Sequence, residues 1–87
     1  MSQQVYNNRH FKIYITAEGE YIVHNSHKSF ESGHTHVRNF STAKYLTKLA
    51  VHSIVPKHLS KYLLVSLIRI STDSEYKGKL YAMLRGQ

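Results

Sequence analysis

The sequence contains no cysteine and no tryptophan, and it has a single proline, Pro56. Without cysteine the chain has no disulfide and no thiolate metal ligand, which is typical of a protein from a reducing compartment. The longest apolar run, residues 62–70, is interrupted by Ser66 and Arg69 and is far shorter than the roughly 20 residues that cross a bilayer. The first residues also lack the apolar segment of a secretion signal. We therefore expect a cytoplasmic protein with no membrane partner, and we expect no cofactor.

Acidic residues are scarce as well. Five Asp and Glu stand against twelve Lys and Arg, which gives a formal net charge of +7 over 87 residues, and seven histidines add further charge in acid. Such an excess attracts anionic partners with an affinity that falls as salt rises. Nucleic acid, DNA or RNA, is the commonest partner of this kind. An acidic protein surface is the alternative partner, and solubility alone is a third explanation of the charge.

Length and a hydrophobic content of 41% predict one small globular domain over residues 1–87. Residues 1–8 are expected to form a loose leader, residues 10–40 a β-rich part and residues 41–86 a helical part. The predicted class is α+β, with an N-terminal β-hairpin or three-stranded antiparallel sheet packed on about three C-terminal helices. A chain this short with a very apolar central helix is also expected to form a homodimer.

The β-rich part begins where apolar and polar residues alternate, in "FKIYI", as they do in a half-buried strand. The stretch "AEGE" predicts a turn, and "YIVH" predicts a second strand. With Glu18 and Gly19 at the centre of a two-residue turn, Ile15 faces Ile22. That register places together on the outer surface Lys12, Tyr14, Tyr21 and Val23. A cation beside aromatic rings suits a nucleic-acid backbone or an unpaired base, and a second core layer is the alternative interpretation.

The stretch "GHTHVRNF" predicts a third strand in which His34, His36 and Arg38 share a face. A His-x-His pair on a strand is able to chelate a metal ion, but a third ligand is missing nearby, so His34 and His36 are only weak metal candidates. If the protein is an enzyme, the two histidines and Arg38 would serve a small ribonuclease, with Lys28 as an additional cation. Our main prediction assigns no catalytic residue and no metal.

Helical spacing predicts three helices after residue 40. The first is capped by Ser41 and ends near Ser53, and the second carries Pro56 in its first turn. The third begins at a capping box from Thr72 to Glu75 and stops at Gly86. The apolar stretch "LLVSLIRI" in the second segment is also compatible with a strand.

Basic residues, with one tyrosine among them, recur every four positions along these predicted helices, so they form lines on the helix surfaces. The lines are Lys44, Lys48 and His52 on the first helix, Lys57 and Lys61 on the second, and Lys77, Tyr81 and Arg85 on the third. An ordinary solvated helix face is the alternative interpretation of each line.

These observations together predict a small, non-catalytic, basic nucleic-acid-binding module, expected in a regulatory or mobile-element system. It would contact backbone phosphates through the helix lines and through Lys12, Tyr14, Tyr21 and Arg38. The alternatives are an adaptor or inhibitor that docks on an acidic protein, and the small histidine-dependent ribonuclease. The order of a short sheet followed by a helix opening "FSTAKYLTKLA" is similar in arrangement to the sheet-based DNA-binding arms of phage-type integrases, and no base-reading residues carry over from them.

Overall fold

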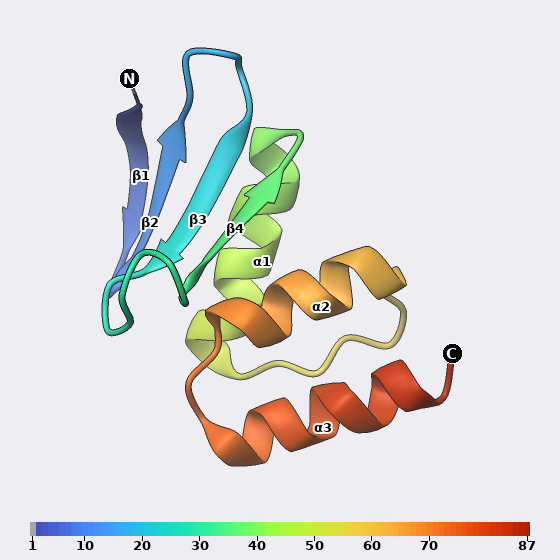
Figure 1. Ribbon diagram of the computed structural model, residues 1–87. Helices are drawn as coiled ribbons and strands as arrows, with labels where there is room; N and C mark the ends of the chain where they lie inside the picture. Colours follow the sequence, from blue (N-terminus) through green and yellow to red (C-terminus); the bar gives the residue numbers. More distant parts are fainter. Residues whose placement is uncertain (1) are drawn as a thin grey trace.

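The computed structural model describes residues 2–87. Within that range, four strands are followed by three helices (Figure 1). The strands are β1 (Gln3–Asn8), β2 (Phe11–Ile15), β3 (Tyr21–Asn25) and β4 (His34–Val37), and the helices are α1 (Phe40–His52), α2 (Lys61–Ile70) and α3 (Ser74–Arg85). The predicted α+β class, an antiparallel sheet followed by three helices, is confirmed.

The strands form one antiparallel meander in the order β1-β2-β3-β4. The predicted loose leader at residues 1–8 is wrong where it overlaps β1. In β1, Gln4 lies opposite Tyr14 and Tyr6 lies opposite Ile13, with a β-bulge between the two pairs. The residues of β1 are mostly polar and exposed, so their side chains give no alternating pattern. The strand is specified by backbone pairing with β2, which composition does not reveal.

The turn between β2 and β3 contains three residues, 17–19, rather than two. The Gly19 N–H donates to the Thr16 carbonyl at 3.0 Å, and the Thr16 N–H donates to the Glu20 carbonyl at 2.9 Å. Gly19 has a φ of 85°, the left-handed conformation that closes a three-residue hairpin turn with a bulge.

This additional turn residue changes the hairpin register by one. Ile15 lies opposite Tyr21, so the predicted pairing of Ile15 with Ile22 is wrong. Because side chains alternate between the two faces of a strand, the shift moves Tyr21 and Val23 to the core side of the sheet and Ile22 to the other side. The predicted outer surface therefore keeps Lys12 and Tyr14 only.

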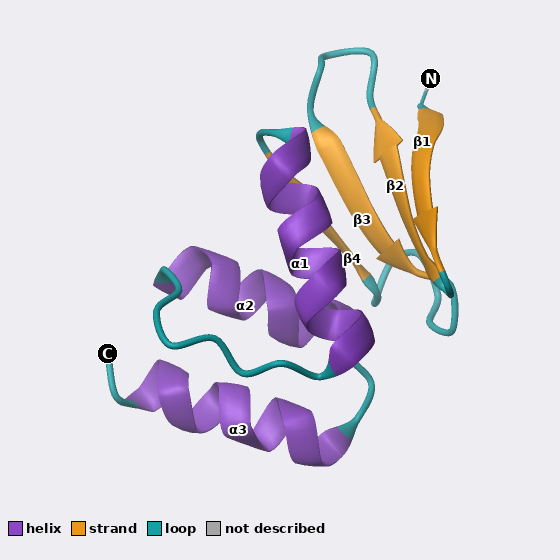
Figure 2. Ribbon diagram, turned by 180° about the vertical axis from the view of Figure 1, so that it is seen from behind, coloured by secondary structure: helices purple, strands orange, loops and turns teal. Residues whose placement is uncertain are grey.

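The core lies between the sheet and the helices. Helix α1 packs on one face of the sheet, and Figure 2 shows it in front of the strands when the molecule is seen from behind. Helix α2 contacts β4 and α1, and α3 packs on α2. The cluster of buried residues combines the strand residues Phe11, Ile13, Val23 and Val37 with the helical residues Ala43, Leu46, Leu49, Leu64, Leu67, Ile68, Ile70, Tyr76 and Leu80.

Two helices begin next to the expected residues rather than at them. Asn39, not Ser41, caps α1, and its side-chain oxygen accepts from the Thr42 N–H at 2.8 Å. Asp73, not Thr72, caps α3, because its carboxylate accepts from the N–H groups of the next turn. In both cases an Asx side chain close to the expected cap, two residues before Ser41 and one residue after Thr72, reaches the unpaired N–H groups of the first turn. The predicted C-terminal stop of α3 at Gly86 is confirmed.

Helix α2 starts five residues later than its proline suggests. Pro56 is buried in an irregular connection over residues 53–60, and Ser60 caps the helix by accepting from the Leu63 N–H at 3.2 Å. The stretch "LLVSLIRI" is helical. Among residues 2–87 no helix has the length and apolar character needed to cross a membrane.

Candidate nucleic-acid interface

One face of the sheet has no helix over it, as Figures 1 and 2 show from its two sides. We call it the open face. Its side chains are Gln4, Asn7, Lys12, Tyr14, Ile22, His24, His34 and His36. Strand pairing aligns them in two rows, Asn7–Lys12–His24–His34 and Gln4–Tyr14–Ile22–His36. All but Ile22 are half-buried or exposed, so the face offers polar, cationic and ring-bearing groups to solvent.

Four rings form a continuous series on this face, which we call the ring series: His24, Phe30, His34 and His36. Phe30 stacks on His34 with centroids 4.2 Å apart and planes 7° apart. His24 lies 5.3 Å from Phe30, and His36 lies 5.2 Å from His34. Phe30, from the loop between β3 and β4, is 49% exposed although it is a large apolar side chain. Its position and exposure were missed by the sequence analysis.

The loop that presents Phe30 is anchored at its base. The Asn25 side chain is fully buried, and its amide donates to the Ile70 carbonyl at the end of α2 at 2.9 Å. Its oxygen accepts from the His27 N–H at 2.9 Å. Gly33 packs so closely that a Cβ there would lie 2.5 Å from the Lys28 Cβ. These contacts hold the loop against the helical part and fix where Phe30 stands.

Two cationic side chains join the same loop to α2, one from the helix and one from the loop. Arg69 on α2 donates from Nε to the His34 carbonyl and from Nη2 to the Glu31 carbonyl, each at 2.7 Å. Lys28 in the loop donates to the Arg69 carbonyl at 2.9 Å. Burial, and then the positive charges of Lys77 and Arg69, lower the pKa of Lys28. The charges of Lys77 and Arg69 therefore lie close enough to Lys28 to disfavour its protonated form.

Carboxylates neutralise little of this surface. Across residues 2–87, Glu75 pairs with Lys79 at 3.8 Å, and Glu20 lies 3.6 Å from the His36 ring, a contact that is an ion pair only when the histidine is protonated. Glu20 directly precedes β3, so its carboxylate contacts the open face at the end of the sheet nearest the β2–β3 turn. Lys12 instead donates to the Asn7 amide oxygen at 3.3 Å.

The structure divides the predicted binding residues between the two sides of the sheet. Lys12 and Tyr14 lie on the open face with His34 and His36. Tyr21 lies on the core side, half-buried, with its ring 5.6 Å from Phe40. The predicted line of Lys44, Lys48 and His52 is exposed along α1, the helix that covers the core side.

Within this α1 line, Lys44 already has a structural role. Its ammonium stands 5.4 Å from the ring centroid of Tyr6 and 5.5 Å from that of Phe40, which is the geometry of a cation–π contact. The contact joins α1 to β1 and accounts for this lysine without a ligand.

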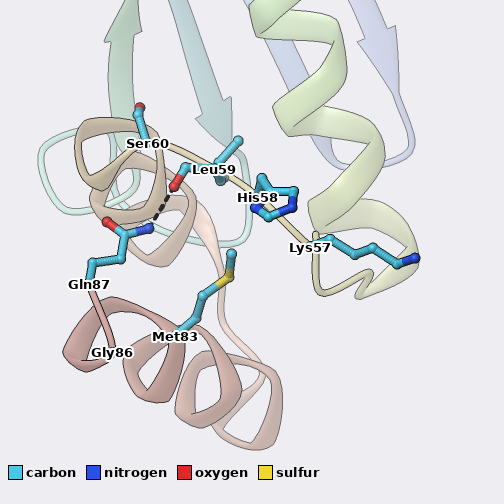
Figure 3. A pocket seen from close by; sticks show the side chains of 7 residues that line it. All are labelled: Lys57, His58, Leu59, Ser60, Met83, Gly86 and Gln87. Atoms are coloured by element: carbon cyan, nitrogen blue, oxygen red, sulfur yellow. Dashed lines mark hydrogen bonds between the residues drawn. The ribbon is translucent and has the colours of Figure 1, made fainter.

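The remaining predicted cations lie on the helical part. Lys57 belongs to the irregular connection, where it lines an open groove of about 600 Å³ with His58, Ser60, Met83 and Gln87 (Figure 3). Lys61 is the first residue of α2. On α3, Lys77 is half-buried near Lys28, whereas Tyr81 and Arg85 are exposed.

The residues predicted for a ribonuclease do not meet in one cavity. Arg38 follows β4 and lines a groove of about 420 Å³ with Val37, Tyr62 and Leu63, and neither His34 nor His36 lines it. In the part of the chain that the structure describes, no group of three or more His, Asp or Glu side chains is placed to hold a metal ion. The His34 and His36 rings are thus neighbours in the ring series with no third ligand.

No protein-family model, curated protein or solved structure matches this chain.

Proposed function

We propose that this protein is a non-catalytic nucleic-acid-binding module whose interface is the open face of the sheet. The observation that supports this most directly is the composition of that face. A sheet surface without a helical cover carries Lys12, Tyr14 and three histidines, and among residues 2–87 the one carboxylate within ion-pair distance of these side chains is that of Glu20, beside His36.

Phosphate contacts supply most of the affinity of basic modules for nucleic acid, and side chains on a sheet reach the sugar and the base. The open face offers both kinds of group. Lys12 sits in the same row as His24 and His34, so a cationic side chain lies beside ring-bearing side chains on neighbouring strands. The net charge of +7 would draw a polyanion toward the domain from any side.

The proposal is tested by titrating fluorescein-labelled DNA and RNA oligonucleotides with the protein and recording anisotropy at about 50 mM and about 200 mM salt, a range over which phosphate contacts weaken strongly. We expect binding to both polymers, weaker at the higher salt. Replacing Lys12 with alanine should reduce the slope of log affinity against log salt by about one, the contribution of a single phosphate contact.

Two further lysine variants locate the interface. Lys79→Ala is the matched control, since Lys79 on α3 is paired with Glu75 and should leave binding unchanged. Lys48→Ala probes the α1 line on the core side of the sheet. A larger loss for Lys48→Ala than for Lys12→Ala would contradict the open face as the interface. Tight binding to an acidic protein without any binding to oligonucleotides would instead support the adaptor or inhibitor alternative.

A further inference from the structure

We propose that the nucleic acid bound by the open face is single-stranded, and that its unpaired bases stack on the ring series with Phe30 as the principal platform. This inference rests on the proposed function and specifies its ligand. The juxtaposition that supports it is a half-exposed phenylalanine at the edge of an uncovered sheet, with three histidine rings in the same series. Among residues 2–87, the cations beside it have no carboxylate partner.

A ring that stacks on a base must be exposed to solvent, and it binds better if its position is already fixed before the ligand arrives. Phe30 stacks against His34 at 4.2 Å while 49% of it remains exposed. An apolar ring in that position gains little for folding, because it lies outside the core cluster. Every base has a π-face, so stacking on such a ring is largely independent of sequence.

The platform is preorganised, which lowers the entropic cost of binding. Asn25 and Arg69 tie the two ends of the loop to the C-terminal end of α2, and the Arg69 guanidinium also holds the carbonyl of His34. The ring of His34 is directed at the Phe30 carbonyl through Nδ1. The stacked pair therefore has a defined orientation before any ligand arrives.

Cations stand on two sides of the ring series, where phosphates of a strand lying along it would pass. Lys12 is in register with His24 and His34 across the strands. On the helical side, Lys28, Arg69 and Lys77 gather around the base of the Phe30 loop without an ion-paired carboxylate among the described residues. Lysine and arginine beside stacking rings form the usual combination in grooves that bind single strands.

The width of the sheet argues against insertion into duplex DNA. Four strands about 4.8 Å apart span about 14 Å between the outer strand axes, before side chains are added. The major groove of B-form DNA is about 12 Å wide and admits a helix or a two-stranded ribbon. In addition, β4 does not form a free edge, because Tyr62 and Arg69 on α2 donate to its His36 and His34 carbonyls.

The test compares one labelled sequence as a single strand, as a duplex, and as a chain of the same length whose bases are replaced by abasic sites. We expect the single strand to bind at least about tenfold more tightly than the other two, since each stacked base contributes at this level. Phe30→Leu should remove most of that preference while leaving duplex binding unchanged. Tyr45→Leu is the matched control, because Tyr45 is exposed to a similar extent, 44%, but lies on α1.

A second variant reports stacking directly. The chain has no tryptophan, so Phe30→Trp introduces a single indole whose fluorescence should be quenched by the single strand and not by the abasic chain. Equal affinity for single strand, duplex and abasic chain, with no effect of Phe30→Leu and no quenching, would overturn the stacking inference and leave the proposed function standing. Failure to bind any of the three would overturn the proposed function itself.

Discussion

The two faces of the sheet are built from the same strands, yet they differ in almost every property. Along β2, Phe11 and Ile13 are buried under α1, while the intervening Lys12 reaches solvent. Along β4, Thr35 and Val37 are buried, whereas His36 is exposed. The core face supplies the buried apolar contacts of the domain, whereas the side chains of the open face, apart from Ile22, remain at least partly accessible to solvent. A shift of one residue in the strand register would exchange the side chains of the two faces.

The core face is not wholly apolar, and its polar groups show how strictly it is organised. Asn25 and Thr35 are buried there, and each has a partner on α2: the Ile70 carbonyl and the Ser66 hydroxyl. Throughout residues 2–87, no buried side-chain nitrogen or oxygen lacks a hydrogen-bond partner. The open face has the opposite character, because all its side chains except Ile22 are half-buried or exposed and water can therefore satisfy their polar groups.

The largest expected effect comes from removing a core-face side chain. Ile13→Ala deletes a fully buried group between α1 and the sheet and should lower the free energy of unfolding by about 3 kcal/mol. Lys12→Ala, one residue away on the open face, should change it by less than about 0.5 kcal/mol. Urea unfolding followed by circular dichroism measures both. Comparable losses for the two variants would show that the faces are not energetically distinct.

A buried polar residue of the core face should come next in size. Asn25→Ala leaves the Ile70 carbonyl and the His27 N–H without their partner, at a cost of about 2 kcal/mol. It should also loosen the Phe30 loop, so single-strand binding should weaken together with stability. The neighbouring open-face variant His24→Ala should affect stability much less. If Asn25→Ala lost the expected stability but bound nucleic acid as tightly as the parent protein, the hydrogen bonds of Asn25 would have no role in the site.

A smaller effect is expected where the core face meets α2. The Thr35 hydroxyl donates to the Ser66 hydroxyl at 2.7 Å, and both residues are buried. Thr35→Val preserves shape but leaves the Ser66 oxygen without this donor, which should cost about 1 kcal/mol. The double variant Thr35→Val with Ser66→Ala should recover part of that loss. A double-mutant cycle with no coupling energy would refute the interaction.

The sequence predicted the fold class because its strongest patterns are local. Alternation in "FKIYI" and helical spacing after residue 40 are properties of single elements, and they identified β2 and the three helices. The length of the hairpin turn could not be read in the same way. Residues "AEGE" accommodate a two- or three-residue turn, and only packing of Val23 and Tyr21 against the core selects the longer one. The strand β1 was missed because its pairing depends on β2 rather than on its own residues.

The candidate site was predicted in fragments for the same reason. Lys12 with Tyr14, and His34 with His36, were each placed on a shared face from alternation alone. That the two pairs lie on the same surface could be known only from the register of β3, which pairs with both β2 and β4. Phe30 and Arg69 could not be found at all, because one lies in a turn-rich loop and the other on a helix far along the sequence. Their proximity exists only after α2 has packed against β4.

The smallest expected effect on stability comes from His10, in the turn between β1 and β2 at one end of the sheet. The His10 ring stacks on that of His27 with centroids 4.0 Å apart, and burial, then the charges of His27 and Arg9, lower the pKa of His10 below its usual 6.5. Because the folded protein disfavours the protonated form relative to the unfolded chain, this contribution to stability is complete above about pH 6.5 and is lost as the pH falls through the lowered pKa. Between about pH 7.5 and about pH 5 the unfolding free energy should decrease, and it should decrease less in His10→Asn. Urea titrations at the two pH values measure the difference, and identical decreases in the two proteins would show that the His10–His27 stack has no part in the acid sensitivity.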